Sequence, residues 1–254
     1  MTTPDPLFDQ LSELSSAAPP RSLLGLVFGQ WTLVDGPAGE LYVAFTDQGI
    51  SYLRTADSVP DEAGFAEAYR ERFGKPLRHA DRPPAGLLRA IRDGNARSLR
   101  FDLRGLSEFE RDVLAATRRI PTGQTRPYGW IAREIGRPGA VRAVGSALGR
   151  NPVPVLIPCH RVTRSDGTLG EYVFGAATKE RLLRAEHTNL DEVHALAGKK
   201  VHYLGSATTG IVCFPTCHNA RRISEPHRRG FGSVKAAERA GYRPCRACRP
   251  GVPA

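Results

Sequence analysis

A proline-rich apolar stretch, residues 151–162, constrains the fold of this chain more than any other segment. It reads Asn-Pro-Val-Pro-Val-Leu-Ile-Pro-Cys-His-Arg-Val, so an apolar run bracketed by prolines ends at Cys159. Each proline fixes its own φ and disfavours the helical conformation in the residue before it. We therefore predict an extended segment that is buried from Val155 to Ile157, stops abruptly at Cys159 and presents the thiol rigidly from the core.

Cys159 is followed at once by His160, and the pair has two interpretations. A lone cysteine is most often a small buried hydrophobe. A thiol beside a histidine can instead be a nucleophile, because the histidine and a carboxylate can take the proton of a thiol whose ordinary pKa is about 8.5. The length and order of the surrounding motif favour the nucleophile.

The order of residues 151–162 resembles, nearly letter for letter, the active-site segment of the O6-alkylguanine-DNA alkyltransferases. The resemblance extends over roughly residues 107–187 and more loosely over the region before them. It implies DNA repair as a methylated-DNA–protein-cysteine methyltransferase: one irreversible transfer of an alkyl group, mainly methyl, from O6 of guanine, or from O4 of thymine, to Cys159. It also implies a proton relay from Cys159 through a water to His160 and Glu186, because neighbouring side chains of an extended chain diverge.

Two short helical patterns, residues 128–135 and 140–148, flank a glycine-containing turn and predict a helix-turn-helix. Ser107 and Glu110 form a capping box that predicts an earlier helix, ending near Arg118. The second pattern holds mostly small residues, which suits either a close, sequence-tolerant contact with DNA or tight helix packing. The resemblance implies that this helix enters the minor groove of double-stranded DNA.

Individual residues of this region have roles that the resemblance implies. Arg142 fills the gap left when the damaged nucleotide rotates out of the stack. Tyr128 contacts the guanine and assists the rotation, and Asn151 links the helix-turn-helix to the active site. The predicted catalytic residues are Cys159, His160, Glu186, Tyr128 and Asn151. The predicted DNA-binding residues are Tyr128, Arg142, Ala143, Gly145 and Ser146.

A loop that follows the nucleophile, residues 169–175, matches the segment that closes over the alkylated base in the family. The predicted substrate pocket consists of Val162, Tyr172, Val173 and Phe174. Val173 and Phe174 stand where other members carry small residues or an Arg-Trp pair. We therefore expect the bulky Phe174 to narrow the pocket and to favour methyl over larger alkyl groups.

Four cysteines near the end of the chain have the spacing of a metal site. Cys213 and Cys217 form a C-x3-C pair, and Cys245 and Cys248 form a C-x2-C pair. Four thiolates on two such knuckles suit tetrahedral zinc, and a segment with so little apolar content needs a metal to fold. No organic cofactor is expected.

The cysteine-rich segment resembles the zinc domain of the adaptive-response protein Ada, in Thr-Thr-Gly-Ile-x-Cys and in Arg-Pro-Cys-x-x-Cys. The resemblance implies that Cys213 occupies the position that accepts methyl groups from methyl phosphotriesters. Phe214 and Thr216 depart from the Arg and Ser of Ada. A second methyl acceptor and a purely structural, DNA-clamping finger therefore both remain open.

Charge is unevenly distributed along the 254 residues. Residues 1–102 hold 11 Lys and Arg against 14 Asp and Glu, residues 103–200 hold 16 against 10, and residues 201–254 hold 9 against 2. A polyanionic partner, most simply DNA, is therefore expected to meet the two later regions. The sequence has neither a signal-peptide pattern nor a membrane-length apolar run, and its cysteines suit a reducing compartment, so we expect a cytoplasmic protein. We also expect it to be a monomer.

The expected fold class is α+β, with a loose tail (1–20), a ribonuclease-H-like domain (21–103), an alkyltransferase domain (104–188), a linker (189–200) and an Ada-like zinc domain (201–254). In the first domain, the alternation predicts an antiparallel meander built from the short runs 26–28, 31–34, 41–45 and 50–53. It also predicts helices over 61–73 and 84–93 and a further strand over 99–103. The ribonuclease-H-like label comes only from the family resemblance.

A different functional class also fits these features. A zinc-dependent protein that binds or senses DNA damage would use the same basic surface and the same four cysteines without any catalytic role for Cys159. Methyl groups found on Cys159 after exposure to methylated DNA would separate the two hypotheses. A cysteine hydrolase is a weaker third hypothesis, because it would need an oxyanion hole for which the sequence gives no sign.

Overall fold

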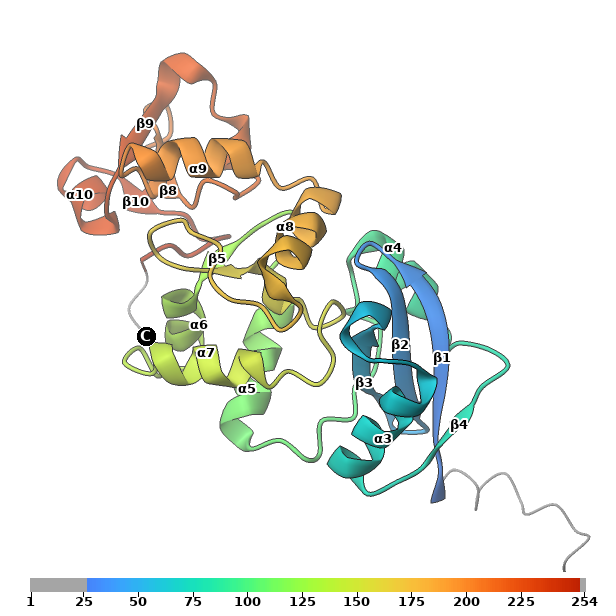
Figure 1. Cartoon of the computed structure of the whole chain (residues 1–254). Helices are drawn as coiled ribbons and strands as arrows, with labels where there is room; N and C mark the ends of the chain where they lie inside the picture. Colours follow the sequence, from blue (N-terminus) through green and yellow to red (C-terminus); the bar gives the residue numbers. More distant parts are fainter. Residues whose placement is uncertain (1–26, 252–254) are drawn as a thin grey trace, which may run out of the picture.

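The computed structural model describes residues 27–251, so the predicted tail over residues 1–20 lies outside the described residues. Figure 1 shows three regions in chain order: a sheet with one long helix across it, a central group of helices, and a small C-terminal region. The fold mixes helices and strands, as predicted. Within residues 27–251, none of the helices is long and apolar enough to cross a membrane.

The first region is built on a meander. Strands β1 (Gly29–Gly36), β2 (Gly39–Thr46) and β3 (Gly49–Thr55) pair antiparallel in sequence order, as predicted. The run predicted over 26–28 is not a strand: Val27 and Phe28 precede β1, and residue 26 lies outside the described residues. A short strand, β4 (Leu77–His79), adds to β1 in parallel. Helices α3 (Glu62–Phe73) and α4 (Leu87–Asp93) confirm the two predicted helices. An aromatic cluster of Trp31, Tyr52, Phe65 and Tyr69 fills the space between the sheet and α3.

The predicted strand over residues 99–103 is wrong. Only a single bridge forms, between Ile50 and Phe101, with hydrogen bonds from Ile50 N to Arg100 O (3.0 Å) and from Asp102 N to Ile50 O (2.9 Å). The ladder cannot continue, because further along β3 the Leu53 N–H donates to Pro152 O (2.9 Å). The free edge of the sheet is thus shared with the proline-rich stretch that leads to Cys159.

The central region contains the predicted helix-turn-helix. Helix α5 (Glu108–Arg118) begins at the capping box of Ser107 and Glu110. Helices α6 (Tyr128–Glu134) and α7 (Val141–Gly149) follow, and α8 (Gly175–Ala185) closes the region. Two very short strands, β5 (Arg126–Pro127) and β6 (Val162–Thr163), pair in parallel and join the entry to α6 to the segment after Cys159.

The C-terminal region is a second four-stranded sheet, in the order β10-β8-β7-β9. Its strands and helix are β7 (Tyr203–Ser206), β8 (Ile211–Cys213), β9 (Arg228–Phe231), α10 (Val234–Arg239) and β10 (Arg243–Pro244). Short 3-10 helices lie at η1 (Ala56–Ser58), η2 (Cys159–Arg161), η3 (Ala220–Arg222) and η4 (Glu225–His227). One contiguous apolar core runs from β2 through the central helices to the four late cysteines.

The segment expected to be a linker is structured. Helix α9 (Leu190–Gly198) occupies most of residues 189–200, with Asn189 as its N-cap. Leu190 is buried, and the Val201 N–H donates to Leu196 O (2.9 Å). Helix α9 lies beside the C-terminal sheet (Figure 1), where Arg228 of β9 forms an ion pair with Glu192 of α9 (2.7 Å). Its Val193 and Ala197 line a cavity together with Thr163 of the central region.

Candidate functional site

The segment leading to Cys159 is buried as predicted, but it is folded into turns and is not extended. The Leu156 N–H donates to Pro154 O and the Ile157 N–H to Val153 O, both at 2.9 Å. Val155 has a φ of 70°, the left-handed region that a β-branched residue rarely adopts. The prolines block both helix and ladder, so a compact turn satisfies the remaining backbone groups and places Cys159 at the start of η2.

Asn151 contacts the sulfur directly. Its Nδ2 donates to Cys159 Sγ (3.2 Å) and to Ile157 O (3.0 Å), while its Oδ1 accepts from the Val153 N–H (3.0 Å). Burial raises the pKa of the Cys159 thiol, and the Asn151 hydrogen bond and the nearby Lys179 charge oppose that increase. Asn151 therefore both shapes the turn and favours the thiolate.

His160 and Glu186 form the predicted pair. His160 Nε2 lies 2.9 Å from Glu186 Oε1, and Arg161 donates to the same carboxylate through Nε (2.9 Å) and Nη2 (2.6 Å). Burial by itself raises the pKa of Glu186, but the hydrogen bonds and charges of His160 and Arg161 lower it to about 2. Burial lowers the pKa of His160, so the ring is neutral.

The other ring nitrogen of His160 is free to take a proton. With the hydrogen on Nε2 directed at Glu186, Nδ1 carries the lone pair, and it is buried with no hydrogen-bond partner among residues 27–251. Cys159 and His160 are neighbours in η2, so a bridging water is the simplest connection from the thiol to Nδ1. This arrangement fits the predicted relay.

Lys179 is a residue of this site that sequence reasoning missed. It is fully buried on α8, and its Nζ donates to Val162 O (2.6 Å) and to Leu169 O. Burial lowers the pKa of Lys179 to about 8, and the Cys159 thiolate opposes the decrease. A helical lysine normally faces solvent, so the sequence held no signal that this one ties β6 to the loop over the pocket.

The predicted DNA-binding residues share one side of the central region. Arg142, Ala143 and Ser146 of α7 are exposed, and Gly145 is partly buried. A Cβ at Gly145 would lie 3.9 Å from Tyr128 Cε1, and one at Gly170 would lie 3.4 Å from the Tyr128 hydroxyl. Tyr128 therefore lies between α7 and the pocket loop, and burial raises its pKa, so the phenol keeps its proton.

The predicted pocket residues are only partly brought together. The ring centroid of Tyr172 lies 6.2 Å from that of His160 and 5.6 Å from that of Phe174. Val162 is buried in β6, whereas Val173 is 39% exposed at the surface. The structure thus places Tyr172 between His160 and Phe174 and leaves Val173 facing solvent.

The four late cysteines form one cluster. Their sulfur atoms all lie within 4.8 Å of one another, and all four residues are buried. Zinc–sulfur bonds of about 2.3 Å in a tetrahedron separate the sulfurs by about 3.8 Å, so the cluster fits zinc. Cys213, at the end of β8, and Cys217 provide one knuckle, and Cys245 and Cys248 provide the other. Asn219 is not itself a ligand, but its Nδ2 donates to Cys245 Sγ (3.4 Å) and so helps to hold that ligand in place.

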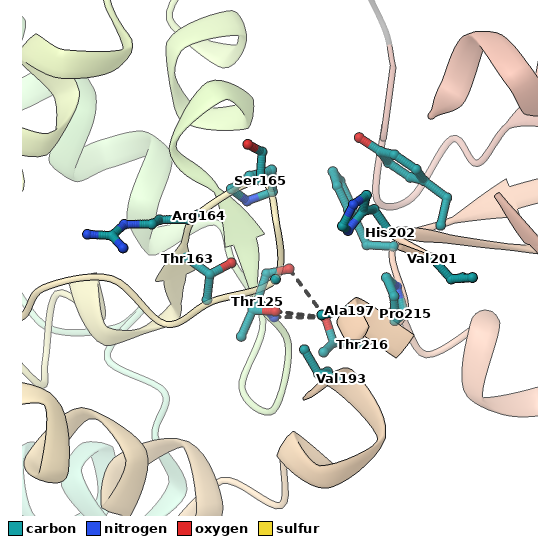
Figure 2. Close-up of a pocket in the computed structure, with 14 residues that line it drawn as sticks. Thr125, Thr163, Arg164, Ser165, Val193, Ala197, Val201, His202, Pro215 and Thr216 are labelled. Carbon is teal, nitrogen blue, oxygen red and sulfur yellow. Dashed lines mark hydrogen bonds between the residues drawn. The ribbon is translucent and has the colours of Figure 1, made fainter. Parts of the chain in front are cut away.

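An interface between the central and C-terminal regions was not foreseen from the sequence. The Thr125 N–H donates to Thr216 Oγ1 (2.9 Å), and Trp130 Nε1 donates to Cys248 O (3.0 Å). Figure 2 shows the Thr125–Thr216 contact beside a cavity of about 50 Å³, whose walls come from β5, β6, α9 and the C-terminal region. Thr216 and Phe214, the two residues that depart from Ada, are both buried here.

Comparisons with known families agree with the two motifs. Residues 108–188 match the family described as 6-O-methylguanine DNA methyltransferase, DNA binding domain. Residues 196–251 match the metal binding domain of Ada.

Individual relatives point the same way. A methylated-DNA–protein-cysteine methyltransferase of Mycolicibacterium paratuberculosis is 40% identical over 159 residues, covering 62% of this chain and 92% of the relative. The Escherichia coli bifunctional transcriptional activator/DNA repair enzyme Ada is 37% identical over 170 residues, but the match covers only 46% of that protein and 63% of this chain.

A solved structure is also similar. The crystal structure of Mycobacterium tuberculosis OGT in complex with DNA superposes with a TM-score of 0.52 at 32% identity, covering 65% of this chain and 98% of that one. The similarity reaches nearly the whole of the smaller protein, so the remaining part of this chain is additional to it.

Proposed function

The chain belongs to the methylated-DNA–protein-cysteine methyltransferase family, and we propose that it repairs DNA by moving an alkyl group from O6 of guanine, or O4 of thymine, to the sulfur of Cys159. The observation that carries the proposal is the hydrogen bond from Asn151 Nδ2 to Cys159 Sγ, 3.2 Å long, in a buried site. An amide aimed at sulfur stabilises the charged form, and the thiolate is the reactive nucleophile.

The reaction balances with residues of the chain. The Cys159 proton passes through water to His160 Nδ1, and Glu186 holds the resulting imidazolium through Nε2. The thiolate attacks the alkyl carbon, a sulfur–carbon bond forms, and the carbon–O6 bond breaks. The departing guanine anion takes its proton from the Tyr128 hydroxyl. The product thioether has no route back to a thiolate, so each molecule acts once.

Access to the base requires the duplex to open. We assign this role to α7, whose exposed Arg142, Ala143 and Ser146 meet the minor groove. Arg142 enters the stack as the nucleotide rotates out. Tyr172 and Phe174 border the space into which the alkylated base turns.

The test is a mass-spectrometric peptide map of the protein after reaction with duplex DNA that carries O6-methylguanine. We expect one methyl group on the peptide that contains Cys159 and none there in Cys159→Ala protein. If the wild-type protein binds the damaged duplex tightly but gains no methyl group, the alternative of a zinc-dependent damage sensor replaces the repair activity.

A second methyl acceptor is a further candidate function, at Cys213. A surface pocket of about 260 Å³ reaches this residue, and Asn219, Arg222, Ser206 and Thr209 also line it. Zinc, when bound, keeps the four thiols deprotonated. The Cys213 sulfur would attack the methyl carbon of a phosphotriester, and the carbon–oxygen bond would break to leave the ordinary phosphodiester anion beside Arg222.

This second activity is tested apart from the first. Cys159→Ala protein is incubated with DNA that carries only methyl phosphotriesters, and the late cysteines are mapped for methyl groups. Methyl on Cys213 supports the acceptor. Unmodified protein that still holds zinc and binds DNA would make the C-terminal domain a structural clamp.

The remaining sequence-based expectations stay predictions. We propose a ribonuclease-H-like fold over residues 21–103, an alkyltransferase domain over 104–188 and a zinc domain over 201–254. We also propose that the protein acts as a monomer in the cytoplasm, on alkylated bases in double-stranded DNA.

A further inference from the structure

Arg126 on β5 is a buried charge without an ordinary counter-ion. Its side chain is 3% exposed, and its guanidinium donates to Thr125 O (2.7 Å) and Gln124 Oε1 (2.6 Å), both neutral acceptors. Its Nε has no hydrogen-bond partner, and none of the carboxylates in residues 27–251 forms a salt bridge with it. Burying an unpaired charge is costly, so a negative group must lie nearby.

The surroundings of Arg126 identify that group. The guanidinium carbon lies 5.2 Å from the centroid of the Phe214 ring and 5.8 Å from that of the Trp130 ring. Phe214 directly follows the ligand Cys213, and Trp130 donates to the backbone oxygen of the ligand Cys248. Both aromatic contacts therefore place the guanidinium beside the four-cysteine cluster.

The charges are complementary. Four thiolates and one Zn²⁺ sum to a net charge of −2, in a setting where water screens poorly. Burial lowers the pKa of Arg126, and each of the four cysteines opposes that decrease. The positive guanidinium of the central region thus faces a negative centre in the C-terminal region.

The position of Arg126 in the chain links this contact to the reaction. Arg126 and Pro127 pair with Val162 and Thr163 of β6, and the next residue, Tyr128, begins α6. A contact that immobilises the Arg126 side chain therefore also limits the movement of the backbone that positions the Tyr128 hydroxyl.

We propose that Arg126 is the counter-charge of the zinc centre and the positioning residue through which that centre holds β5, Tyr128 and α6 in their reactive arrangement. The zinc domain then helps to hold residues of the alkyltransferase site in position. The kinetic consequence rests on the proposed function, whereas the effects on zinc binding and local structure do not.

The first experiment measures zinc affinity by competition with a chromophoric chelator. Removing a supporting residue outside the metal's first shell typically costs about 10- to 100-fold in affinity, so we expect that loss in Arg126→Met and a smaller one in Arg126→Lys, which keeps the charge. Arg118→Met is the matched control. Arg118 is a partly buried guanidinium that donates to Ala96 O (3.1 Å) and lies 4.5 Å from the Phe101 ring, with no cysteine acting on it.

The second experiment needs no variant. Hydrogen exchange is compared in the zinc-loaded protein and after zinc removal by the chelator. We expect protection to fall in residues 126–134, which hold β5 and α6, and to stay unchanged in α3 of the first region. Unchanged protection of residues 126–134, or equal zinc affinity in Arg126→Met and Arg118→Met, would overturn the proposal.

The third measurement is the single-turnover rate on O6-methylguanine duplex, which should fall on zinc removal in the wild-type protein. A zinc-loaded protein with no methyl transfer at all would refute the proposed function and leave the first two experiments to decide the role of Arg126.

Discussion

The two cysteine sites of this protein make their sulfur atoms reactive in different ways. Cys159 is a single thiol whose burial raises its pKa, and it depends on Asn151, His160 and Glu186 to become a thiolate. The four late cysteines depend on one another and on a metal. The first site therefore draws on residues from α7 to the end of α8, while the sulfur ligands of the second come from two short knuckles. The comparison teaches that a lone nucleophile needs the whole domain around it.

The largest effect should come from removing the lone thiol. Cys159→Ala should abolish methyl transfer from O6-methylguanine, because no other side chain can take the alkyl group from the flipped base. DNA affinity and zinc content should stay at wild-type values, since neither site shares a ligand with the other. Methyl transfer, DNA binding by gel shift and metal content are measured on one preparation. Methyl transfer from O6-methylguanine retained in this variant would show that Cys159 is not the sole acceptor for this lesion.

Next comes the proton acceptor, which only the first site needs. His160→Ala should slow methyl transfer by about 10²- to 10⁴-fold, the usual contribution of a positioned general base. The rate should recover partly at high pH, where solvent ionises the thiol directly. Any methylation of Cys213 should be unaffected, because its sulfur needs no base. Single-turnover kinetics on the two lesions provide the comparison, and an equal loss on both would contradict it.

Acid should weaken the first site through Glu186. Its pKa is about 2 in the folded protein against about 4.5 for an ordinary glutamate, so the carboxylate contributes stability that is fully present above pH 4.5 and is lost as the pH falls towards 2. The shift corresponds to about 3 kcal/mol in the free energy of unfolding. Urea unfolding at pH 7 and pH 3 should show a loss of about 2 kcal/mol of this contribution, because pH 3 still lies above the folded pKa. Glu186→Gln is the variant in which this part of the pH dependence should disappear.

Loss of the arginine that supports base rotation should affect the repair of duplex DNA much more than the reaction with the free base. Arg142→Ala should slow repair of duplex DNA by about 10- to 100-fold, because unstacking a base costs a few kcal/mol and the inserted arginine offsets part of that cost. Reaction with free O6-methylguanine should be nearly unchanged, since Arg142 is exposed on α7 and has no role in the thiol chemistry. Equal losses on both substrates would make the residue a structural one.

The smallest effect concerns the size of the alkyl group. Phe174 packs against Tyr172, with ring centroids 5.6 Å apart, and Tyr172 in turn packs edge-on to His160, so we expect Phe174 to narrow the space for the alkyl group. Methyl should react faster than benzyl in the wild-type protein, and Phe174→Gly should reduce that difference by several-fold at the cost of local packing. Competition between the two lesions measures the ratio. A wild-type protein that accepts both groups alike would show that the first site has no such filter.

Sequence patterns identified the elements whose causes are local. The capping box at Ser107, the meander and the helix-turn-helix could be predicted, because alternation, caps and turn residues act within a few positions. The errors came where distant segments compete. Residues 99–103 lost their ladder because Pro152 occupies part of the β3 edge, and the stretch before Cys159 folded into turns because its prolines leave few backbone donors.

The sequence by itself determined which residues carry the chemistry: the Cys159–His160 motif, with Glu186 assigned by family resemblance, and four cysteines spaced for one metal. Only the tertiary structure decided how each is supported. It directed Asn151 at the sulfur, buried Lys179 under the pocket loop and set Arg126 between Phe214 and Trp130. The reason is physical. Ligand spacing is set by bonds along the chain, but a buried charge is stabilised by partners that only folding brings near.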